Sequence, residues 1–272
     1  MPRRLAVVAG AGALAPRVIE AALAAGDDVQ AFVLSSQALP TGAPQQPASA
    51  GEPAALFDAI RAFGASHVTL AGAVTLSDAD RQKLLLALGA DEQPTGDAAL
   101  SHLVRRLQEI TGAVLVGPHL LAPDLLTPEG RIGGPRPELR QLASARLALA
   151  AAREVGRMDL GQAAIAFGQR IVAVEDVAGT DDLLARVARY RADGLIGDTS
   201  IAPGVLAKAC KPQQPLFVDL PAIGPDTIAG VRNAGISLIA LEAGRTLLLE
   251  REQLVAAADQ HGISIVGLAI DG

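Results

Sequence analysis

Apolar runs that alternate with helical stretches constrain the fold of this chain more than any other feature. Four runs in the first half are typical of buried parallel strands, because they are almost entirely apolar: Leu5–Ala9, Val29–Leu34, His67–Ala71 and Ala113–Val116. Between them the sequence predicts helices over Leu14–Ala25, Ala54–Phe63, Ser77–Leu88 and about Asp97–Ile110, and a surface loop over residues 35–53. These crossovers are too long for hairpins, so we expect a parallel sheet covered by helices.

A break rich in glycine and proline divides the chain. Residues 127–137 read TPEGRIGGPRP, and such stretches are typical of domain boundaries. We therefore expect a Rossmann-like domain over 1–132, a linker over 133–137 and a second domain over 138–272. The fold class that follows is α/β with two domains, an N-terminal Rossmann-like parallel sheet with helices and a C-terminal mixed α/β sheet.

The second half has a different pattern. Two apolar runs around Gly168-Gln169, Gln162–Phe167 and Arg170–Glu175, predict a hairpin. Further strands are expected at Val205–Ala209, Leu216–Asp219, Leu238–Leu241 and Ile263–Val266. Helices are expected at Glu138–Val155, Asp181–Arg191, Pro225–Ala234 and Arg251–His261. Hairpin and crossover connections together predict a mixed sheet.

Composition excludes some classes of function. Aromatic residues make up 2% and the formal net charge is -6, so a nucleic-acid partner is not expected. The single cysteine, Cys210, forms no intrachain disulfide, which fits a cytoplasmic protein. No run reaches the roughly 18 apolar residues of a spanning helix. The mean hydropathy of +0.33 leaves peripheral contact with a membrane open.

A glycine motif follows the first strand. Gly10, Gly12 and Ala15 match the G-x-G-x-x-G/A pattern, in which glycine lets backbone approach a ligand at a helix N-terminus. A dinucleotide site also needs an acid at the end of the second strand, but that strand ends Val33-Leu34-Ser35-Ser36. The motif therefore indicates either a ligand-lining loop or only a tight strand-to-helix turn.

The densest group of chemical side chains lies between residues 217 and 227. Asp219 closes a short apolar strand, and Asp226 follows Pro225 in the first turn of a helix. Each could serve only as a cap or as a partner of the helix dipole. Together they sit on one strand–turn–helix connection of an α/β sheet, where ligands bind. Two carboxylates suit Mg²⁺, which completes its shell with water and phosphate oxygens.

A second acidic turn precedes them. Gly179, Thr180 and Asp181 open a helix and offer backbone amides, a hydroxyl and a carboxylate, although a simple N-cap explains them equally well. Lys208 and Lys211 flank Cys210, and lysine commonly pairs with phosphate, although solvated surface is the alternative. Cys210 is interpreted as a packing residue. The four histidines have no zinc-ligand spacing.

An ordered series of motifs along nearly the whole chain resembles the LpxI-type UDP-2,3-diacylglucosamine diphosphatases of lipid A biosynthesis. The matching stretches include LAVVAGAGAL from Leu5, GDAAL from Gly96, VGPHLLAPDLLTPEG from Val116, DLGQ from Asp159, VEDVAGTD from Val174, DLPAIGPDT from Asp219 and EAGRTLLL from Glu242. The resemblance implies a cytoplasmic Gram-negative enzyme of two domains, with the active site between them. It implies metal-assisted hydrolysis to UMP and 2,3-diacylglucosamine 1-phosphate.

The resemblance and the residues together give a hypothesis for the site. Asp219 and Asp226 would hold Mg²⁺ or the attacking water, and Asp226 is implied as the acid most needed for catalysis. The substrate would contact the side chains and backbone of Gly10, Gly12, Ala13, Asp97, Gln162, Gly179, Thr180, Asp181 and Lys208. Homodimer formation and contact with the inner membrane are left open.

Two other functions are compatible with parts of the sequence. An NAD(P)-dependent oxidoreductase would explain the glycine motif alone, and tight NADH binding would favour it. A non-catalytic nucleotide-sugar-binding protein would bind the UDP-sugar without releasing UMP.

Overall fold

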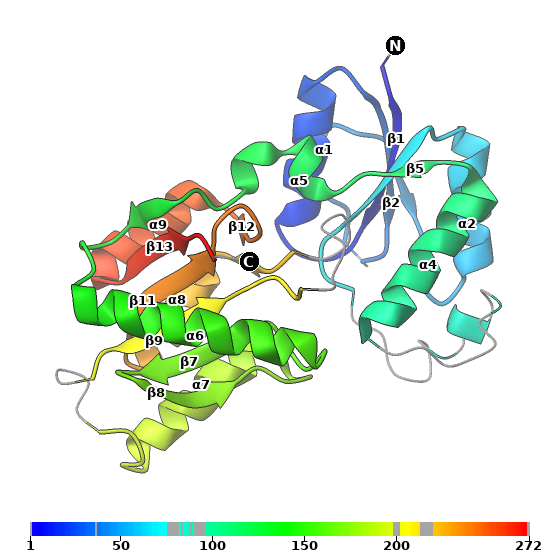
Figure 1. Ribbon diagram of the computed structural model, residues 1–272. Coiled ribbons are helices and arrows are strands. Elements are labelled where there is room, and N and C mark those ends of the chain that lie inside the picture. Colours follow the sequence, from blue (N-terminus) through cyan, green and yellow to red (C-terminus); the bar gives the residue numbers. More distant parts are fainter. Residues whose placement is uncertain are drawn as a thin grey trace. The chain divides into compact units, whose positions relative to one another are not determined.

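The computed structural model describes residues 2–35, 37–74, 82, 84–86, 89, 96–197, 202–212 and 220–270, with the side chains of 96–100 left aside. The described residues form two compact units, the first ending at Pro123 and the second beginning at Asp124 (Figure 1). Each unit is built around its own sheet, which confirms the expected α/β class. No helix among these residues combines the length and apolar character needed to cross a membrane.

The first unit contains a parallel sheet of five strands in the order β3-β2-β1-β4-β5. The strands are β1 (Arg4–Ala9), β2 (Asp28–Val33), β3 (Gln45–Pro47), β4 (His67–Ala71) and β5 (Val114–Leu115). The helices are α1 (Leu14–Ala24), α2 (Pro53–Phe63), α4 (Gly96–Thr111) and α5 (Pro118–Leu121). Helices α1 and α5 lie on one side of this sheet and α2 and α4 on the other (Figure 1). This is the Rossmann-like arrangement that the apolar runs predict.

Alternate residues of β1 supply the two cores of the first unit. Leu5 and Val7 pack with the apolar side of α1, whereas Ala6 and Val8 pack with residues of α2 and α4. A strand covered on both faces needs apolar side chains at every position, because successive side chains point to opposite faces. The continuous run of apolar residues in β1 therefore follows from its central place in the sheet.

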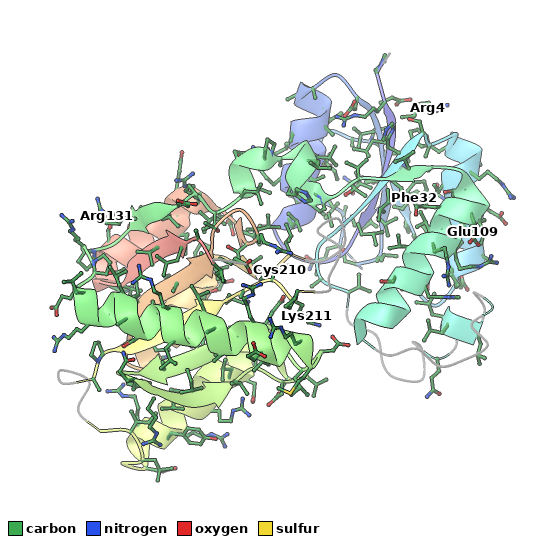
Figure 2. All side chains as sticks on the ribbon, viewed as in Figure 1. Arg4, Phe32, Glu109, Arg131, Cys210 and Lys211 are labelled. Carbon is green, nitrogen blue, oxygen red and sulfur yellow. The ribbon has the colours of Figure 1, made fainter. Side chains whose placement is uncertain are left out.

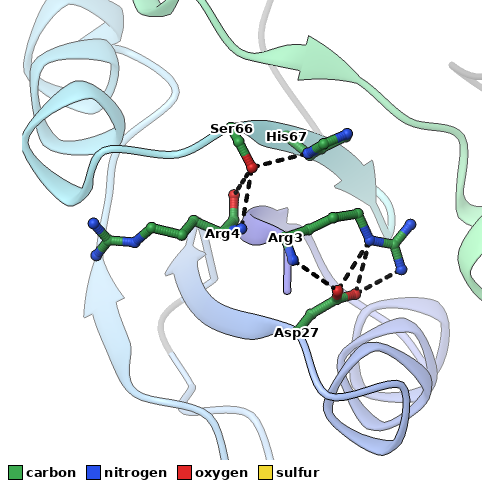
Figure 3. A network of polar contacts seen from close by, with 5 residues as sticks. All are labelled: Arg3, Arg4, Asp27, Ser66 and His67. Carbon is green, nitrogen blue, oxygen red and sulfur yellow. Dashed lines mark hydrogen bonds and ion pairs between the residues drawn. The ribbon is translucent and has the colours of Figure 1, made fainter. Parts of the chain in front are cut away.

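Polar contacts fix the amino ends of the first strands (Figure 3). The Arg3 guanidinium donates to both carboxylate oxygens of Asp27, at 2.7 to 3.1 Å, and this hydrogen bonding raises the pKa of Arg3. The Ser66 hydroxyl accepts from the Arg4 amide at 3.1 Å and lies 2.9 Å from Nδ1 of His67. Asp27 thus has a structural partner, Arg3, at the amino ends of β1 and β2, whereas the glycine motif follows the carboxyl end of β1.

The second unit contains a mixed sheet of six strands in the order β6-β13-β11-β9-β7-β8. Its strands are β6 (Gly130–Gly133), β7 (Ala163–Phe167), β8 (Arg170–Val174), β9 (Gly204–Lys208), β11 (Ile236–Glu242) and β13 (Ser264–Leu268). Strands β9, β11 and β13 are parallel, and β6, β7 and β8 make antiparallel pairs. A small parallel pair adds β10 (Ala222–Ile223) and β12 (Leu247–Leu248). The expected mixed sheet and its hairpin are confirmed.

Helices cover both faces of the mixed sheet. They are α6 (Leu139–Arg157), α7 (Gly179–Ala192), α8 (Pro225–Asn233) and α9 (Arg251–His261), and the short turn η1 (Pro123–Leu125) precedes them. Ala148 and Ala152 of α6 pack on Ala164 and Val205. On the other face, residues such as Leu183, Ile228 and Leu254 of α7, α8 and α9 pack on Ile165, Leu206 and Ile239. Two cores therefore sandwich β7, β9 and β11.

The division between units differs from the expected one. Residues 124–132, which the sequence pattern assigns to the first domain, belong to the second unit. The reason is strand β6, which lies partly within the expected linker 133–137 and pairs antiparallel with β13, Gly133 facing Ile265. Strand β3 lies where the sequence predicts a loop. Most of the expected helix 77–88 and all of the expected strand 216–219 lie outside the described residues.

Candidate functional site

The carboxyl edge of the mixed sheet gathers the polar residues of the second unit. Strands β9 and β11 end there with Lys208 and Glu242. Because β7 is antiparallel to β9, its start lies at the same edge, with Ala163 opposite Lys208. Gln162 comes just before β7, and Glu175 follows the end of β8. Carboxyl ends of parallel strands are common ligand sites, so this edge is the candidate site.

Lys208, Thr180 and Glu175 form a hydrogen-bonded chain at this edge. The Lys208 ammonium donates to the Thr180 hydroxyl at 2.9 Å and to the Ala222 carbonyl oxygen at 3.1 Å. The Thr180 hydroxyl donates to Glu175 Oε1 at 2.5 Å, and Glu175 Oε2 accepts the Gln162 amide at 2.7 Å. Lys208 and Glu175 are each only 6% exposed. Buried charges need such partners.

Glycine allows the backbone to close around Glu175. A Cβ atom on Gly161 would lie 2.7 Å from the Glu175 carbonyl oxygen and 2.8 Å from its Cβ. The Glu175 amide also donates to the Ala163 carbonyl oxygen at 2.8 Å. The loop before β7 and the loop after β8 therefore touch at Gly161 and Glu175. The side-chain oxygen of Gln162, in the same loop, is buried without a hydrogen-bond partner.

Glu242 organises a second polar group next to the first. Its Oε2 accepts the Cys210 amide at 2.8 Å, and its Oε1 lies 3.7 Å from Nε of Arg245. The Thr246 hydroxyl donates to the Glu242 carbonyl oxygen at 2.9 Å and lies 2.7 Å from the Thr127 hydroxyl. Figure 2 labels Cys210 and Lys211 where the chain leaves β9, and Lys211 pairs with Asp159 at 2.6 Å. Cys210 is buried, as expected of a packing residue.

Asp226 lies in the first turn of α8 and is exposed to solvent. Asp219, its expected companion, lies outside the described residues. Among the residues that the structure describes, three or more potential His, Cys, Asp or Glu ligands gather nowhere. An exposed carboxylate nevertheless fits Mg²⁺, which takes one or two carboxylates and completes its shell with water and substrate phosphate.

The start of α7 presents the other expected residues of this unit. Gly179 has a φ of 82°, Thr180 is half-buried and Asp181 is exposed. Just before the helix, Asp176 accepts the Ala178 amide at 2.9 Å and pairs with Arg186 at 2.7 Å. These two hydrogen bonds lower the pKa of Asp176, the Ala178 amide having the larger effect. Asp176 therefore stays ionised and compensated.

In the first unit the glycine motif has a structural explanation. A Cβ on Gly10 would lie 2.4 Å from the Ala73 carbonyl oxygen, so Gly10 allows β1 and β4 to exit side by side. Gly12 is exposed, with a φ of 93° and open space around its Cα, and Ala13 is half-buried before α1. Asp97 lies in the first turn of α4, with its side chain outside the described part. The close approach at Gly10 is to protein backbone.

Sequence reasoning did not select three residues of the candidate site: Glu175, Glu242 and Arg245. Both glutamates come directly after or at the end of a mostly apolar strand, and both are buried. A carboxylate at the end of an apolar strand was the sequence signal that could have identified both residues. Arg245 belongs to the site because it lies three residues beyond Glu242 and is the cation next to this buried carboxylate.

Comparison with known proteins assigns the family. A model of the LpxI N-terminal domain matches residues 4–125, and a model of the LpxI C-terminal domain matches residues 128–266. The chain belongs to the LpxI family. The range matched by the C-terminal model contains Glu175, Lys208 and Asp226, so these residues of the candidate site lie within the LpxI C-terminal domain.

A curated LpxI relative extends over nearly the whole chain. The UDP-2,3-diacylglucosamine pyrophosphatase LpxI of Caulobacter vibrioides is 36% identical over 275 residues, covering 98% of each protein. Two solved structures show only distant similarity to this chain. The Bordetella bronchiseptica enzyme WbmG, in complex with NAD and UDP, gives a TM-score of 0.29 at 17% identity, over 42% of this chain and 36% of that one. A putative NAD-dependent epimerase/dehydratase from Methylobacillus flagellatus gives 0.29 at 11%, over 100% and 86%.

Proposed function

We propose that this LpxI-family chain hydrolyses the diphosphate of UDP-2,3-diacylglucosamine to UMP and 2,3-diacylglucosamine 1-phosphate, in lipid A biosynthesis and with Mg²⁺ as cofactor. The observation that carries this proposal is the end-to-end identity of 36% to a curated relative that bears the name of the pyrophosphatase. The hydrogen-bonded Lys208 at the carboxyl edge of the mixed sheet supports it. The proposal places the chain in the cytoplasm, in peripheral contact with the inner membrane.

The reaction mainly requires charge compensation and an aligned water. Water oxygen bonds to one phosphorus, the bond from that phosphorus to the bridging oxygen breaks, and the leaving phosphate takes the electron pair. Asp226, exposed in the first turn of α8, orients the water and accepts its proton. The Lys208 ammonium offsets the negative charge that develops on the leaving phosphate. When bound, Mg²⁺ supplies further charge compensation at the phosphate oxygens.

Other residues keep their expected places in this proposal. Asp219 would share the metal with Asp226. Gln162 offers a buried side-chain oxygen without a protein partner, which suits a donor group of the substrate. The exposed backbone at Gly12 and Ala13 and the first turn of α4 at Asp97 are assigned to the nucleoside side. Gly179 and Asp181, at the start of α7, are assigned to the sugar or phosphate.

Exposed apolar side chains near the candidate site suit the acyl part of the substrate. Met158, Leu160 and Val177 are exposed and lie on the two loops that touch at Gly161 and Glu175. The acids of these loops are compensated, since Asp159 pairs with Lys211 and Asp176 with Arg186. Apolar side chains with paired charges around them are suited to a lipid surface. We assign this surface, Met158, Leu160 and Val177, to the bilayer that holds the diacyl substrate.

The test is UMP release by the purified full chain from UDP-2,3-diacylglucosamine, with and without Mg²⁺. We expect release only with the metal, and a loss of at least about a hundredfold in kcat for Asp226→Asn with retained substrate binding. Glu252→Gln is the matched control, because Glu252 is likewise an exposed acid in the first turn of a helix, α9. It should turn over at the wild-type rate.

Three results would contradict the proposal. UMP release by Asp226→Asn at the rate of the control removes Asp226 from the mechanism. Binding of the UDP-sugar by the wild-type chain without any UMP release favours a nucleotide-sugar-binding protein. Tight binding of NADH, measured by its fluorescence, favours an oxidoreductase.

A further inference from the structure

The hydroxyl of Thr180 stands between a buried cation and a buried anion. It has one proton, and the 2.5 Å contact to Glu175 Oε1 uses it, because an ionised carboxylate only accepts. The same oxygen accepts from Lys208 Nζ at 2.9 Å. A hydroxyl in this state has no proton left to donate to a phosphate oxygen. Donation from Thr180 to a phosphate oxygen, one of the substrate contacts that the sequence leaves open, therefore conflicts with these hydrogen bonds.

Glu175 is held in place from several directions. Its second carboxylate oxygen accepts the Gln162 amide at 2.7 Å, and its own amide donates to Ala163 at 2.8 Å. Because Gly161 has no side chain, the loop before β7 packs directly against Glu175. These contacts tie the carboxylate to the start of β7, the strand next to β9. Glu175 is therefore a fixed anchor, whereas Lys208 has a long side chain that needs one.

We propose that Glu175 and Thr180 are positioning residues that hold the Lys208 ammonium in place at the candidate site. Glu175 orients the Thr180 hydroxyl, and one of the two lone pairs of its oxygen accepts from Lys208 Nζ. The Ala222 carbonyl oxygen, 3.1 Å away, accepts from the same ammonium. The inference rests on the proposed function, in which Lys208 compensates charge on the leaving phosphate. It deepens that function by assigning two residues that act through Lys208 rather than on the substrate.

The first test is a mutant cycle on turnover. Thr180→Val removes the hydroxyl at nearly constant volume, and Glu175→Gln removes the charge. Each should lower kcat by at least about tenfold with a smaller change in KM, because displacing a charge-compensating group by about 1 Å affects the transition state most. Thr180→Ser should restore the rate. In a Lys208→Met background, Thr180→Val should lower kcat no further, because the group that it positions is gone.

The second test is independent of turnover. The chain has three lysines, Lys83, Lys208 and Lys211, so ¹⁵N-lysine labelling gives few Nζ signals, and Lys208→Met identifies the one from Lys208. A buried, hydrogen-bonded ammonium exchanges its protons slowly and is visible. We expect this signal to shift or broaden in Thr180→Val and Glu175→Gln and to stay in Thr180→Ser. Ser264→Ala is the control, since it removes another hydroxyl bond of the sheet, 2.7 Å to Pro135, without touching Lys208.

The outcomes separate this inference from the proposed function. A wild-type chain without UMP release overturns the proposed function and leaves the Nζ experiment to decide the positioning. Unchanged Nζ signals in Thr180→Val overturn the positioning, and so does a further loss of kcat on adding Thr180→Val to Lys208→Met. If Glu175→Gln does not fold, the Val and Ser variants of Thr180 decide alone, because their side chain is only half-buried.

Discussion

Two buried glutamates perform the same local task at the carboxyl edge of the mixed sheet. Glu175 accepts the amide of Gln162, and Glu242 accepts the amide of Cys210. Each glutamate also lies near a cation. Glu175 is linked to Lys208 through Thr180, and Glu242 lies near Arg245. A carboxylate that accepts a backbone amide makes a charge-assisted hydrogen bond, stronger than a neutral one. The start of β7 and the end of β9, between which Lys208 lies, are thereby fixed.

His119 of α5 gives a prediction of pH dependence. Desolvation by burial lowers the pKa of His119, and its Nδ1 is buried without a hydrogen-bond partner. The folded chain therefore binds fewer protons than the unfolded chain, in which the pKa is about 6.5. The contribution of neutral His119 to the stability is fully present above the unfolded-state pKa. It is lost as the pH falls from that value through the lower folded-state pKa. We expect His119→Gln to weaken the fall in Tm between neutral pH and about pH 5.

A control on the same helix separates titration from damage to α5. Leu120 is exposed next to His119, so Leu120→Gln alters the helix without removing a titrating group. This variant should keep the wild-type dependence of Tm on pH. An equal reduction of that dependence in both variants would show that the ring of His119 is not its source.

Residue roles were harder to predict from the sequence than residue types. The sequence indicates Thr180 and Lys208 as members of one site, and the structure brings them into contact. It does not indicate that Glu175 takes the single proton of Thr180, because the Glu175 carboxylate is held by the Gln162 amide of another loop, the one before β7. For Asp226, its position in the first turn of a helix follows from Pro225 and is confirmed. Its chemical role stays a prediction.

At the level of elements, apolar runs predicted the central strands and the edge strands β5 and β8, but they did not predict the edge strands β3 and β6. Strand β1 is apolar on both faces because helices cover both, and such runs are unmistakable. Strand β3 is Gln45-Gln46-Pro47 and pairs only with β2, so its proline and polar side chains resemble a loop. Strand β6 is rich in glycine and becomes a strand only by pairing with β13. Such edges depend on partners distant in sequence.

The glycine motif after β1 gives a prediction at the same level. Gly10 donates to Ala71, and Ala11 and Ala73 exchange backbone hydrogen bonds, so the exits of β1 and β4 lie against each other. Gly10→Ala would place a Cβ within 2.4 Å of the Ala73 carbonyl oxygen. We expect the free energy of unfolding, measured in urea, to fall by roughly 1–3 kcal/mol. Gly42→Ala, with no heavy atom within 4 Å, should change little, and equal stability of both variants would contradict this explanation.

For the whole molecule, the assignment of Met158, Leu160 and Val177 to a bilayer surface predicts vesicle binding. The full chain should co-sediment with vesicles of phosphatidylethanolamine and phosphatidylglycerol. The triple variant Met158→Gln, Leu160→Gln, Val177→Thr should bind at least about fivefold more weakly. Each Å² of apolar surface that is no longer buried in the bilayer lowers the binding free energy by roughly 25 cal/mol. Leu139 and Leu195 are also exposed in the second unit but lie at the start of α6 and beyond the end of α7, towards the other edge of the sheet.

These two leucines provide the matched control. Changing Leu139 and Leu195 together to Gln removes exposed apolar side chains away from the candidate site, and vesicle binding should remain as in the wild type. Equal losses in the two sets of variants would mean that general surface hydrophobicity, rather than this surface, drives binding. No binding by the wild-type chain would remove the bilayer assignment.

Three of the four outer strands of the two sheets have little free backbone to offer. In the first unit the edges are β3 and β5, three and two residues long, and in the second β6 has four. Short edges give another copy few unpaired amides and carbonyls on which to extend a sheet. Association of copies by continuous intermolecular β-pairing is therefore disfavoured at these edges. At these three edges a homodimer would have to assemble through complementary side-chain surfaces, whereas β8, the fourth outer strand, has five residues and pairs only with β7.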